Sequence, residues 1–178
     1  KQVFGGYVTS VSSPEDKNVE FLMASFGFPL LHRSFEYEFA QVPDDIDFCS
    51  EVSSYHKEQI KGKALLVDRG GCQFKEKANF AADAGANLLL LANHEEHLIR
   101  MGVEPRWEGF NATIPFAMVS KSGGEILQKK ISNGDKLFVV PDGNVNSRDY
   151  ELVSALALNY MENENTPHEN SWPISPSD

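Results

Sequence analysis

The distribution of apolar and polar residues predicts a chain built mainly of short strands with two helices among them. Seven segments have the length and apolar content of strands: 3–11, 19–26, 35–42, 63–67, 88–91, 114–119 and 136–140. Residues 35–42 alternate apolar and polar positions, which is typical of a strand with one wet face. Residues 88–91 are continuously apolar, so we expect that strand to be covered on both faces.

Two segments have the spacing of amphipathic helices. The first follows the strand at 63–67, and its apolar positions recur at helical spacing: Phe74, Ala78, Ala81 and Gly85. The second is expected to open with a capping box at residues 122–125 and to run through Ile131. Strand, helix and strand between residues 63 and 91 form a βαβ unit, which implies parallel pairing of its two strands.

The remaining segments are polar or atypical. Residues 93–113 are interpreted as a long loop with one helical turn at 94–101, and residues 150–161 are apolar enough to pack back on the domain. Beyond them the chain is rich in Asn, Glu, Pro and Ser, which favours disorder. We therefore expect a domain at 1–161, including an N-terminal strand extension, and an acidic disordered tail or linker at 162–178.

The net charge of −10 limits the classes of partner. Six acids and no Lys or Arg lie in residues 149–178, so that segment is either a solvated tail or an acidic patch for a basic partner. Nucleic acid and anionic membranes attract basic surfaces, and neither is expected to bind here. No stretch reaches the roughly 20 apolar residues of a membrane span, so any membrane attachment would need an anchor outside this chain.

Two cysteines and one glycosylation sequence indicate the cellular compartment of the protein. Cys49 and Cys72 could be free thiols, half of a metal site or one disulfide, although they lack the spacing of a zinc site. A disulfide would close a loop of about 24 residues and stabilise the fold by roughly 3 kcal/mol. The tripeptide Asn-Ala-Thr at 111–113 is an N-glycosylation acceptor. Together these features favour the secretory lumen over the cytosol.

No sequence motif predicts catalysis. The segment 94–97, His-Glu-Glu-His, places its histidines three residues apart, whereas the zincin motif needs four. We interpret it as a solvated helical turn and expect neither a metal nor a cofactor. The glycine pairs at 70–71 and 123–124 precede predicted helices, where either an anion site or a tight turn would suit them.

Residues 63–78, KALLVDRGGCQFKEKA, and 84–90, AGANLLL, resemble the protease-associated (PA) domain. The signature of that family is a strand ending in R-G-x-C-x-F, a helix, an A-G-A turn and an apolar strand. The strand opened by Ile114 and Pro115 also matches, and the resemblance spans residues 35–141. Residues 13–29 look like the amino-terminal part of plant vacuolar sorting receptors and small secreted PA-only proteins, and residues 88–131 resemble plant signal-peptide-peptidase-like proteases.

The resemblance implies a fold, a disulfide and a function. The fold would be α/β (α+β), a small β-barrel or sandwich with two main flanking helices. The disulfide would join Cys49 to Cys72. Domains of this family lack catalytic residues and bind peptides or position substrates, and in the sorting receptors the R-G-x-C loop contacts cargo peptide, which corresponds to Arg69 here.

These arguments give a hypothesis about the binding site. Arg69 offers a fork of donors, Gly70 and Gly71 leave backbone N–H groups uncovered, and Trp107 and Phe110 are large apolar residues in a polar loop. We expect these five residues to bind a protein or peptide ligand. The alternatives are an ion pair of Arg69 with Asp68 or Glu76, and a Trp107 that folds inward.

The resemblance leaves the parent protein open. The first interpretation is a non-catalytic domain that recruits cargo or substrate in the secretory lumen, in an endomembrane or vacuolar compartment, or outside the cell. The second is a regulatory domain of a larger membrane protease or transmembrane ubiquitin ligase that contacts its own parent chain. A free-standing secreted enzyme is the third.

Asn111 is predicted to carry a glycan when the protein is made in a eukaryotic secretory host. The Asn111→Gln variant should then migrate faster than the parent on a denaturing gel, because it lacks the added mass. Glycosidase treatment should bring the two proteins to the same position. Equal migration before treatment would contradict the prediction.

Overall fold

The computed structural model describes residues 4–10, 18–30, 33–102, 113–142 and 152–153. In these residues the elements follow one another as β1 (Gly5–Ser10), β2 (Val19–Met23), β3 (Phe35–Tyr37), α1 (Ser54–Ile60), β4 (Ala64–Asp68), α2 (Phe74–Asp83), β5 (Leu88–Ala92), β6 (Arg100–Met101), β7 (Phe116–Val119), α3 (Lys121–Ser132), β8 (Leu137–Asp142) and β9 (Leu152–Val153). Each of the seven apolar segments contains a strand.

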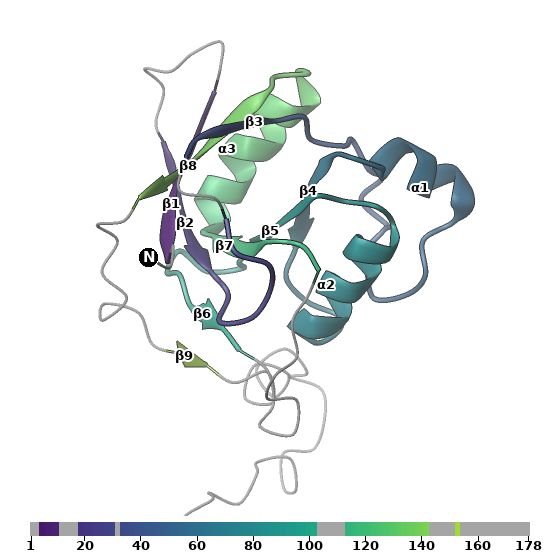
Figure 1. Ribbon diagram of the computed structural model, residues 1–178, viewed down its shortest axis with the longest axis horizontal. Helices are drawn as coiled ribbons and strands as arrows, with labels where there is room; N and C mark the ends of the chain where they lie inside the picture. The colour runs from purple at the N-terminus through teal and green to yellow at the C-terminus, as the bar shows by residue number, and fades with distance from the viewer. Residues whose placement is uncertain (1–3, 11–17, 31–32, 103–112, 143–151, 154–178) are drawn as a thin grey trace, which may run out of the picture.

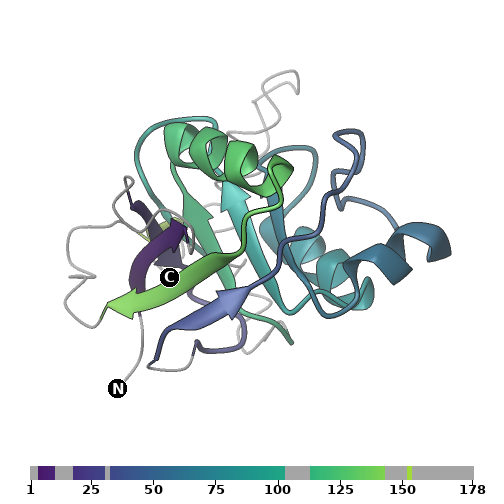
Figure 2. The same cartoon turned by 90° about the horizontal axis from the view of Figure 1, so that it is seen from above.

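Seven strands form one curled sheet in the order β3-β8-β1-β2-β7-β5-β4 (Figures 1 and 2). The half from β3 to β7 is antiparallel, and β4, β5 and β7 are parallel to one another. The predicted parallel pairing across α2 is therefore confirmed, and the curled sheet agrees with the expected barrel-like α+β fold. A separate parallel pair joins β6 to β9.

The parallel half of the sheet is covered on both faces, as the apolar run at 88–91 predicts. Leu89 and Leu91 belong to a core cluster with Phe74 and Ala78 of α2. Leu88 and Leu90 belong to a second cluster with residues of α3. Figure 1 shows α3 on one side of these strands and α2 on the other. In the described part of the chain, the helices are too short and too polar to cross a lipid bilayer.

Three details of the sequence prediction were wrong. The strand at 35–42 ends at Tyr37, because Glu38 and Ala40 bond instead to the backbone of Ala64. The helical turn expected at 94–101 is absent, and that segment bends and then forms β6. The second helix begins at Lys121 rather than with a capping box at 122–125, because Ser120 is the residue whose hydroxyl accepts the Gly123 N–H.

Helix α1 was not predicted. It is capped by Ser53, whose hydroxyl accepts the N–H of His56, and its one buried residue is Ile60. A seven-residue helix with a single buried position has no apolar periodicity to recognise. The fold therefore has three helices in the described residues where two were expected.

Helix α3 lies close to the sheet because it carries two consecutive glycines. A Cβ built on Gly124 would lie 2.6 Å from the Cβ of Ala92, and one on Gly123 would lie 2.7 Å from Val19. Both distances are shorter than real side chains tolerate. The glycine pair therefore sets the spacing between α3 and the strands β2 and β5.

The variant Gly124→Ala is expected to lower the free energy of unfolding. Alanine favours a helix over glycine by about 1 kcal/mol, but overpacking against Ala92 costs typically 1–3 kcal/mol, so the net loss should be up to about 2 kcal/mol. Urea unfolding followed by circular dichroism measures it. The neighbouring exposed variant Glu125→Ala is the control and should change stability by less than about 0.5 kcal/mol. A stabilised Gly124→Ala protein would show that α3 is free to move.

Candidate peptide-binding groove

The turn that follows β4 has a backbone that glycine favours. Gly70 and Gly71 have φ values of 125° and 85°, which L side chains rarely adopt. A Cβ on Gly71 would also lie 3.2 Å from the Sγ of Cys49 and from the Oδ2 of Asp47, whereas Gly70 has open space around it. The turn therefore presents backbone rather than side chains at its outer surface.

A disulfide fastens this turn to the loop before α1. Cys49 and Cys72 are joined, with their Cα atoms 5.6 Å apart and a sequence separation of 23. The pairing implied by the family resemblance is therefore confirmed. Phe48, next to Cys49, is fully buried with a φ of 59°, so the loop is held in a backbone conformation that is uncommon for a bulky residue.

A buried lysine binds the same loop. Lys77 is completely buried, and its Nζ donates to the backbone carbonyl of Asp47 at 2.7 Å and approaches the Sγ of Cys49 at 3.5 Å. Sequence reasoning missed this residue. The available signal was its position, because Lys77 falls at helical spacing from the apolar residues Phe74 and Ala81 of α2.

Arg69 is buried, with 8% of its surface exposed. Its Nη1 donates to the Oδ1 of Asn93 at 3.0 Å, and its guanidinium carbon lies 5.6 Å from the ring centre of Phe74. Asn93 is fixed in turn, since its amide nitrogen donates to the carbonyl of His97 at 2.9 Å. The Nη1 partner of Arg69 is thus a neutral amide at the end of β5. The Glu76 carboxylate accepts the N–H of Gln73 at 2.8 Å.

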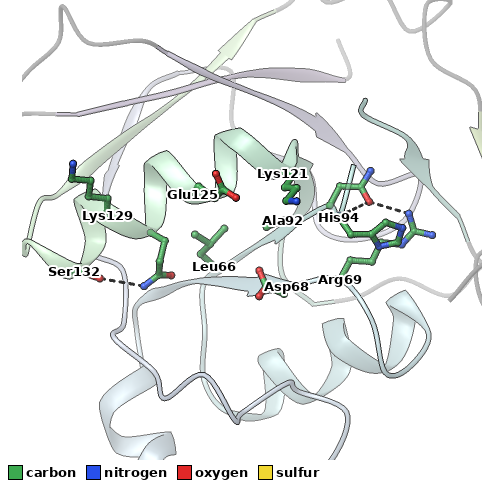
Figure 3. A pocket seen from close by; sticks show the side chains of 12 residues that line it. Leu66, Asp68, Arg69, Ala92, His94, Lys121, Glu125, Lys129 and Ser132 are labelled. Atoms are coloured by element: carbon green, nitrogen blue, oxygen red, sulfur yellow. Dashed lines mark hydrogen bonds between the residues drawn. The ribbon is translucent and has the colours of Figure 1, made fainter. Parts of the chain in front are cut away.

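A groove of about 610 Å³ lies between α3 and the end of β4. We call it the α3–β4 groove. Its lining residues come from β4, β5 and α3: Leu66, Asp68, Arg69, Ala92, Asn93, His94, Lys121, Gly124, Glu125, Gln128, Lys129 and Ser132. In Figure 3, Arg69 and His94 lie together at one end, Lys129 and Ser132 lie at the other, and the side chain of Leu66 points into the space between. The groove therefore has an apolar floor and charged ends.

Charges of both signs line the groove. Arg69, Lys121 and Lys129 are cationic, and Asp68 and Glu125 are anionic. Such a mixture suits a ligand with polar and ionic groups of its own better than a purely apolar one. Burial raises the pKa of the Tyr37 hydroxyl and lowers the pKa of the Arg100 guanidinium, and neither residue lines this groove.

The N-terminus of α3 is satisfied by the chain itself. The N–H of Lys121 donates to the carbonyl of Glu95 at 3.0 Å, and the N–H of Ser122 donates to the carboxylate of Glu96 at 3.1 Å. The Ser122 hydroxyl also donates to that carboxylate. The segment 94–97 thus caps a helix instead of forming a solvated helical turn. Across the residues with described positions, no cluster of His, Cys, Asp and Glu is arranged to hold a metal.

Three residues of the sequence hypothesis lie outside the described residues. These are Trp107, Phe110 and Asn111. Of the other three, Arg69 lines one end of the α3–β4 groove, whereas Gly70 and Gly71, which follow it in the turn, are not among the residues that line it. Asn93 and the α3 residues of the groove wall were not predicted, because their proximity to Arg69 depends on how the strands are ordered in the sheet.

Comparison with known proteins finds PA domains among receptors and proteases. The profile of the PA domain matches residues 36–127. Signal peptide peptidase-like 3 of Arabidopsis thaliana is 41% identical over 88 residues, covering 49% of this chain and 16% of the relative. Vacuolar-sorting receptor 1 of Pisum sativum is 34% identical over 140 residues, covering 73% and 22%. The Arabidopsis thaliana protein "Receptor homology region, transmembrane domain- and RING domain-containing protein 6" is 27% identical. The match covers 73% of this chain and 41% of that relative.

Solved structures with this fold include aminopeptidases. The zinc aminopeptidase of Bacillus subtilis superposes with a TM-score of 0.52 at 21% identity, covering 79% of this chain and 30% of that one. An aminopeptidase of an Aneurinibacillus strain superposes with a TM-score of 0.51 at 15% identity. That superposition covers 79% of this chain and 31% of the aminopeptidase. At these identities the likeness concerns the fold alone. The chain spans less than half the length of each protein named.

The Cys49–Cys72 disulfide is expected to contribute about 3 kcal/mol to the free energy of unfolding, because it lowers the conformational entropy of the unfolded chain. The double variant Cys49→Ser/Cys72→Ser should lose about that amount in urea unfolding. Intact mass after alkylation under denaturing conditions should show two labelled thiols only when reductant is present. Two labels without reductant would refute the pairing.

Proposed function

Since the chain belongs to the protease-associated (PA) domain family, we propose that it is a non-catalytic domain that binds a protein or peptide and recruits it as cargo or substrate. Vacuolar-sorting receptors and signal peptide peptidase-like proteins among the relatives support a binding or regulatory role. The observation that carries the proposal is the α3–β4 groove, which opens beside the R-G-G-C turn.

The residues of the turn have distinct roles in this proposal. Gly70 and Gly71 expose backbone N–H groups, which bind peptide carbonyls without selecting a sequence. Arg69 is held by Asn93 at the end of the groove, so its guanidinium is pre-organised for a carboxylate or a carbonyl. Trp107 and Phe110 are proposed as apolar anchors for the ligand.

The proposed environment is the lumen of the secretory pathway, a vacuolar compartment or the cell exterior. The disulfide supports it, because disulfides persist in oxidising compartments. The names of the relatives, which include vacuolar-sorting receptors, point the same way. Glycosylation at Asn111 would be consistent with this location.

A second candidate is a regulatory domain that contacts its own parent chain. It is favoured by the lengths of the relatives, since the matched region makes up 16% of one signal peptide peptidase-like protein and 41% of the RING protein. In that case the α3–β4 groove would receive a segment of the same polypeptide. The two candidates share the site and differ in the origin of the ligand.

The binding proposal is tested with a random octapeptide library selected on the immobilised domain. Enriched peptides are synthesised, and their dissociation constants are measured by fluorescence anisotropy. Arg69→Ala and Trp107→Ala should each weaken binding roughly ten- to a hundredfold, the effect of losing one polar or aromatic anchor. Because Arg69 is buried, each variant is first checked for an unchanged melting temperature.

A charge reversal in the groove provides a second variant. Lys129→Glu changes an exposed side chain of the groove wall and should also weaken binding. Lys61→Glu is the matched control, because Lys61 is an exposed lysine outside the groove. Full affinity in all three folded site variants would place the site elsewhere. A library without enriched peptides would leave the parent-chain interpretation as the better one.

A further inference from the structure

Strand β4 forms one edge of the seven-stranded sheet, and only the beginning of that edge is paired. The N–H of Ala64 donates to the carbonyl of Glu38, and the carbonyl of Ala64 accepts the N–H of Ala40, both at 2.9 Å. Phe39 and Ala64 make a single parallel bridge there. No further bridge joins the two segments in the described residues, so the ladder stops after Ala64.

The backbone groups of Leu66 and Asp68 face the same outer side as those of Ala64. Along a strand, the N–H and C=O of one residue lie on one side, and the side alternates from residue to residue. The N–H of Arg69 donates to the carbonyl of Ala92 in β5, so the odd-numbered residues of this strand face β5. Leu66 and Asp68 therefore present two donors and two acceptors to the outer edge, and within the described chain no hydrogen bond reaches them from that side.

The neighbouring chain does not close this edge. After Ala40 no backbone hydrogen bond in the described residues joins this segment to β4, and the N–H of Ile46 bonds to the carbonyl of Pro43, which folds residues 43–46 into a turn. Proline has no N–H to offer a strand in any case. Between this turn and β4 lies a smaller cavity lined by Leu66, Val67 and Asp68 on one side and by Val42, Asp44 and Asp47 among others on the other. We call it the edge cavity.

The α3–β4 groove and the edge cavity meet at the unpaired part of β4, since Leu66 and Asp68 line both. They lie on opposite faces of the sheet. Leu66 packs against the cluster that contains α3, and Val67 belongs to the cluster that contains α2. Successive side chains of a strand point to opposite faces. A strand added at this edge would therefore direct alternate side chains into the two spaces.

The two spaces differ in charge. In the α3–β4 groove, Arg69, Lys121 and Lys129 outnumber Asp68 and Glu125. In the edge cavity the acidic residues that face β4 are Asp44 and Asp47, and among the described residues no lysine or arginine lines it. An acidic side chain is thus favoured on the α3 face and a basic one on the opposite face.

We propose that the ligand is an extended peptide segment that docks as an additional strand on the Leu66–Asp68 edge of β4, with an acidic residue toward α3 and an adjacent basic residue in the edge cavity. This inference rests on the proposed peptide-binding function and specifies the ligand and its mode of binding. Backbone hydrogen bonds supply affinity that is independent of sequence, and the two spaces supply the preference for side chains.

The first test uses an enriched octapeptide from the library and its singly N-methylated versions. Methylation removes one backbone donor, so affinity should fall roughly ten- to a hundredfold at alternate residues and change little at the residues between them. In the free domain, the amide protons of Leu66 and Asp68 should exchange quickly with solvent. The bound peptide should slow their exchange at least about tenfold, while the Val67 amide, which faces β5, exchanges slowly in both states.

The second test exchanges charges. Asp44→Lys should lower the affinity for the peptide at least about tenfold. Replacing the basic residue of the peptide by Glu should restore binding to that variant. Asp45→Lys is the matched control, because Asp45 is the exposed neighbour of Asp44 and does not line the edge cavity. Its effect should stay below about twofold.

The outcomes separate this inference from the function on which it rests. Peptide binding that depends on Arg69 but shows neither alternation under N-methylation nor slowed exchange at Leu66 and Asp68 would overturn strand addition and leave the binding function standing. Equal effects of Asp44→Lys and Asp45→Lys would overturn the charge preference. A library without enriched peptides would overturn both the recruitment of separate peptides and their docking on β4, and would favour the parent-chain interpretation.

Discussion

The burial of β5 on both faces is the constraint from which the rest of this structure follows. Every residue from Leu88 to Ala92 is buried, so a helix must pack on each side of the strand. Helix α2 precedes β5 and covers one face, and α3 follows β7 and covers the other. Because β4, β5 and β7 are parallel, their carboxyl ends gather at one end of the sheet. The turn at 68–73 and the start of α3 are thereby brought to the same end.

The groove exists because α3 covers the sheet only partly. Gly123 and Gly124 let α3 sit directly over β2 and β5, and β4 extends beyond the helix as the last strand. The space between helix and edge strand is filled only at its floor, by Leu66 and Ala92. The glycine pair therefore allows the close contact of α3 with β2 and β5, and the same placement of α3 leaves the α3–β4 groove open.

Sequence patterns predicted the parts of the fold that depend on apolar periodicity. The strands and α2 are of this kind, and the R-G-G-C turn was recognisable from its residues. Helix α1 escaped because it buries only Ile60. The roles of Lys77, Asn93 and Glu96 escaped for another reason: each is polar, and each bonds a residue at least four positions away whose proximity arises only in the folded chain. Arg69 was predicted as a site residue, but its enclosure by Asn93 and Phe74 follows from the pairing of β4 with β5.

The ammonium group of Lys77 has a consequence for how the domain responds to reducing conditions. The covalent bond between Cys49 and Cys72 acts mainly by restricting the unfolded chain, whereas the hydrogen bond from Lys77 to the carbonyl of Asp47 holds the loop in the folded state. The conformation of the loop therefore depends on the Lys77 hydrogen bond, and the stability of the fold depends on the disulfide. A molecule that loses its disulfide keeps the loop fastened as long as it stays folded. What it loses is part of its free energy of unfolding, so redox conditions govern the stability of the domain rather than its geometry.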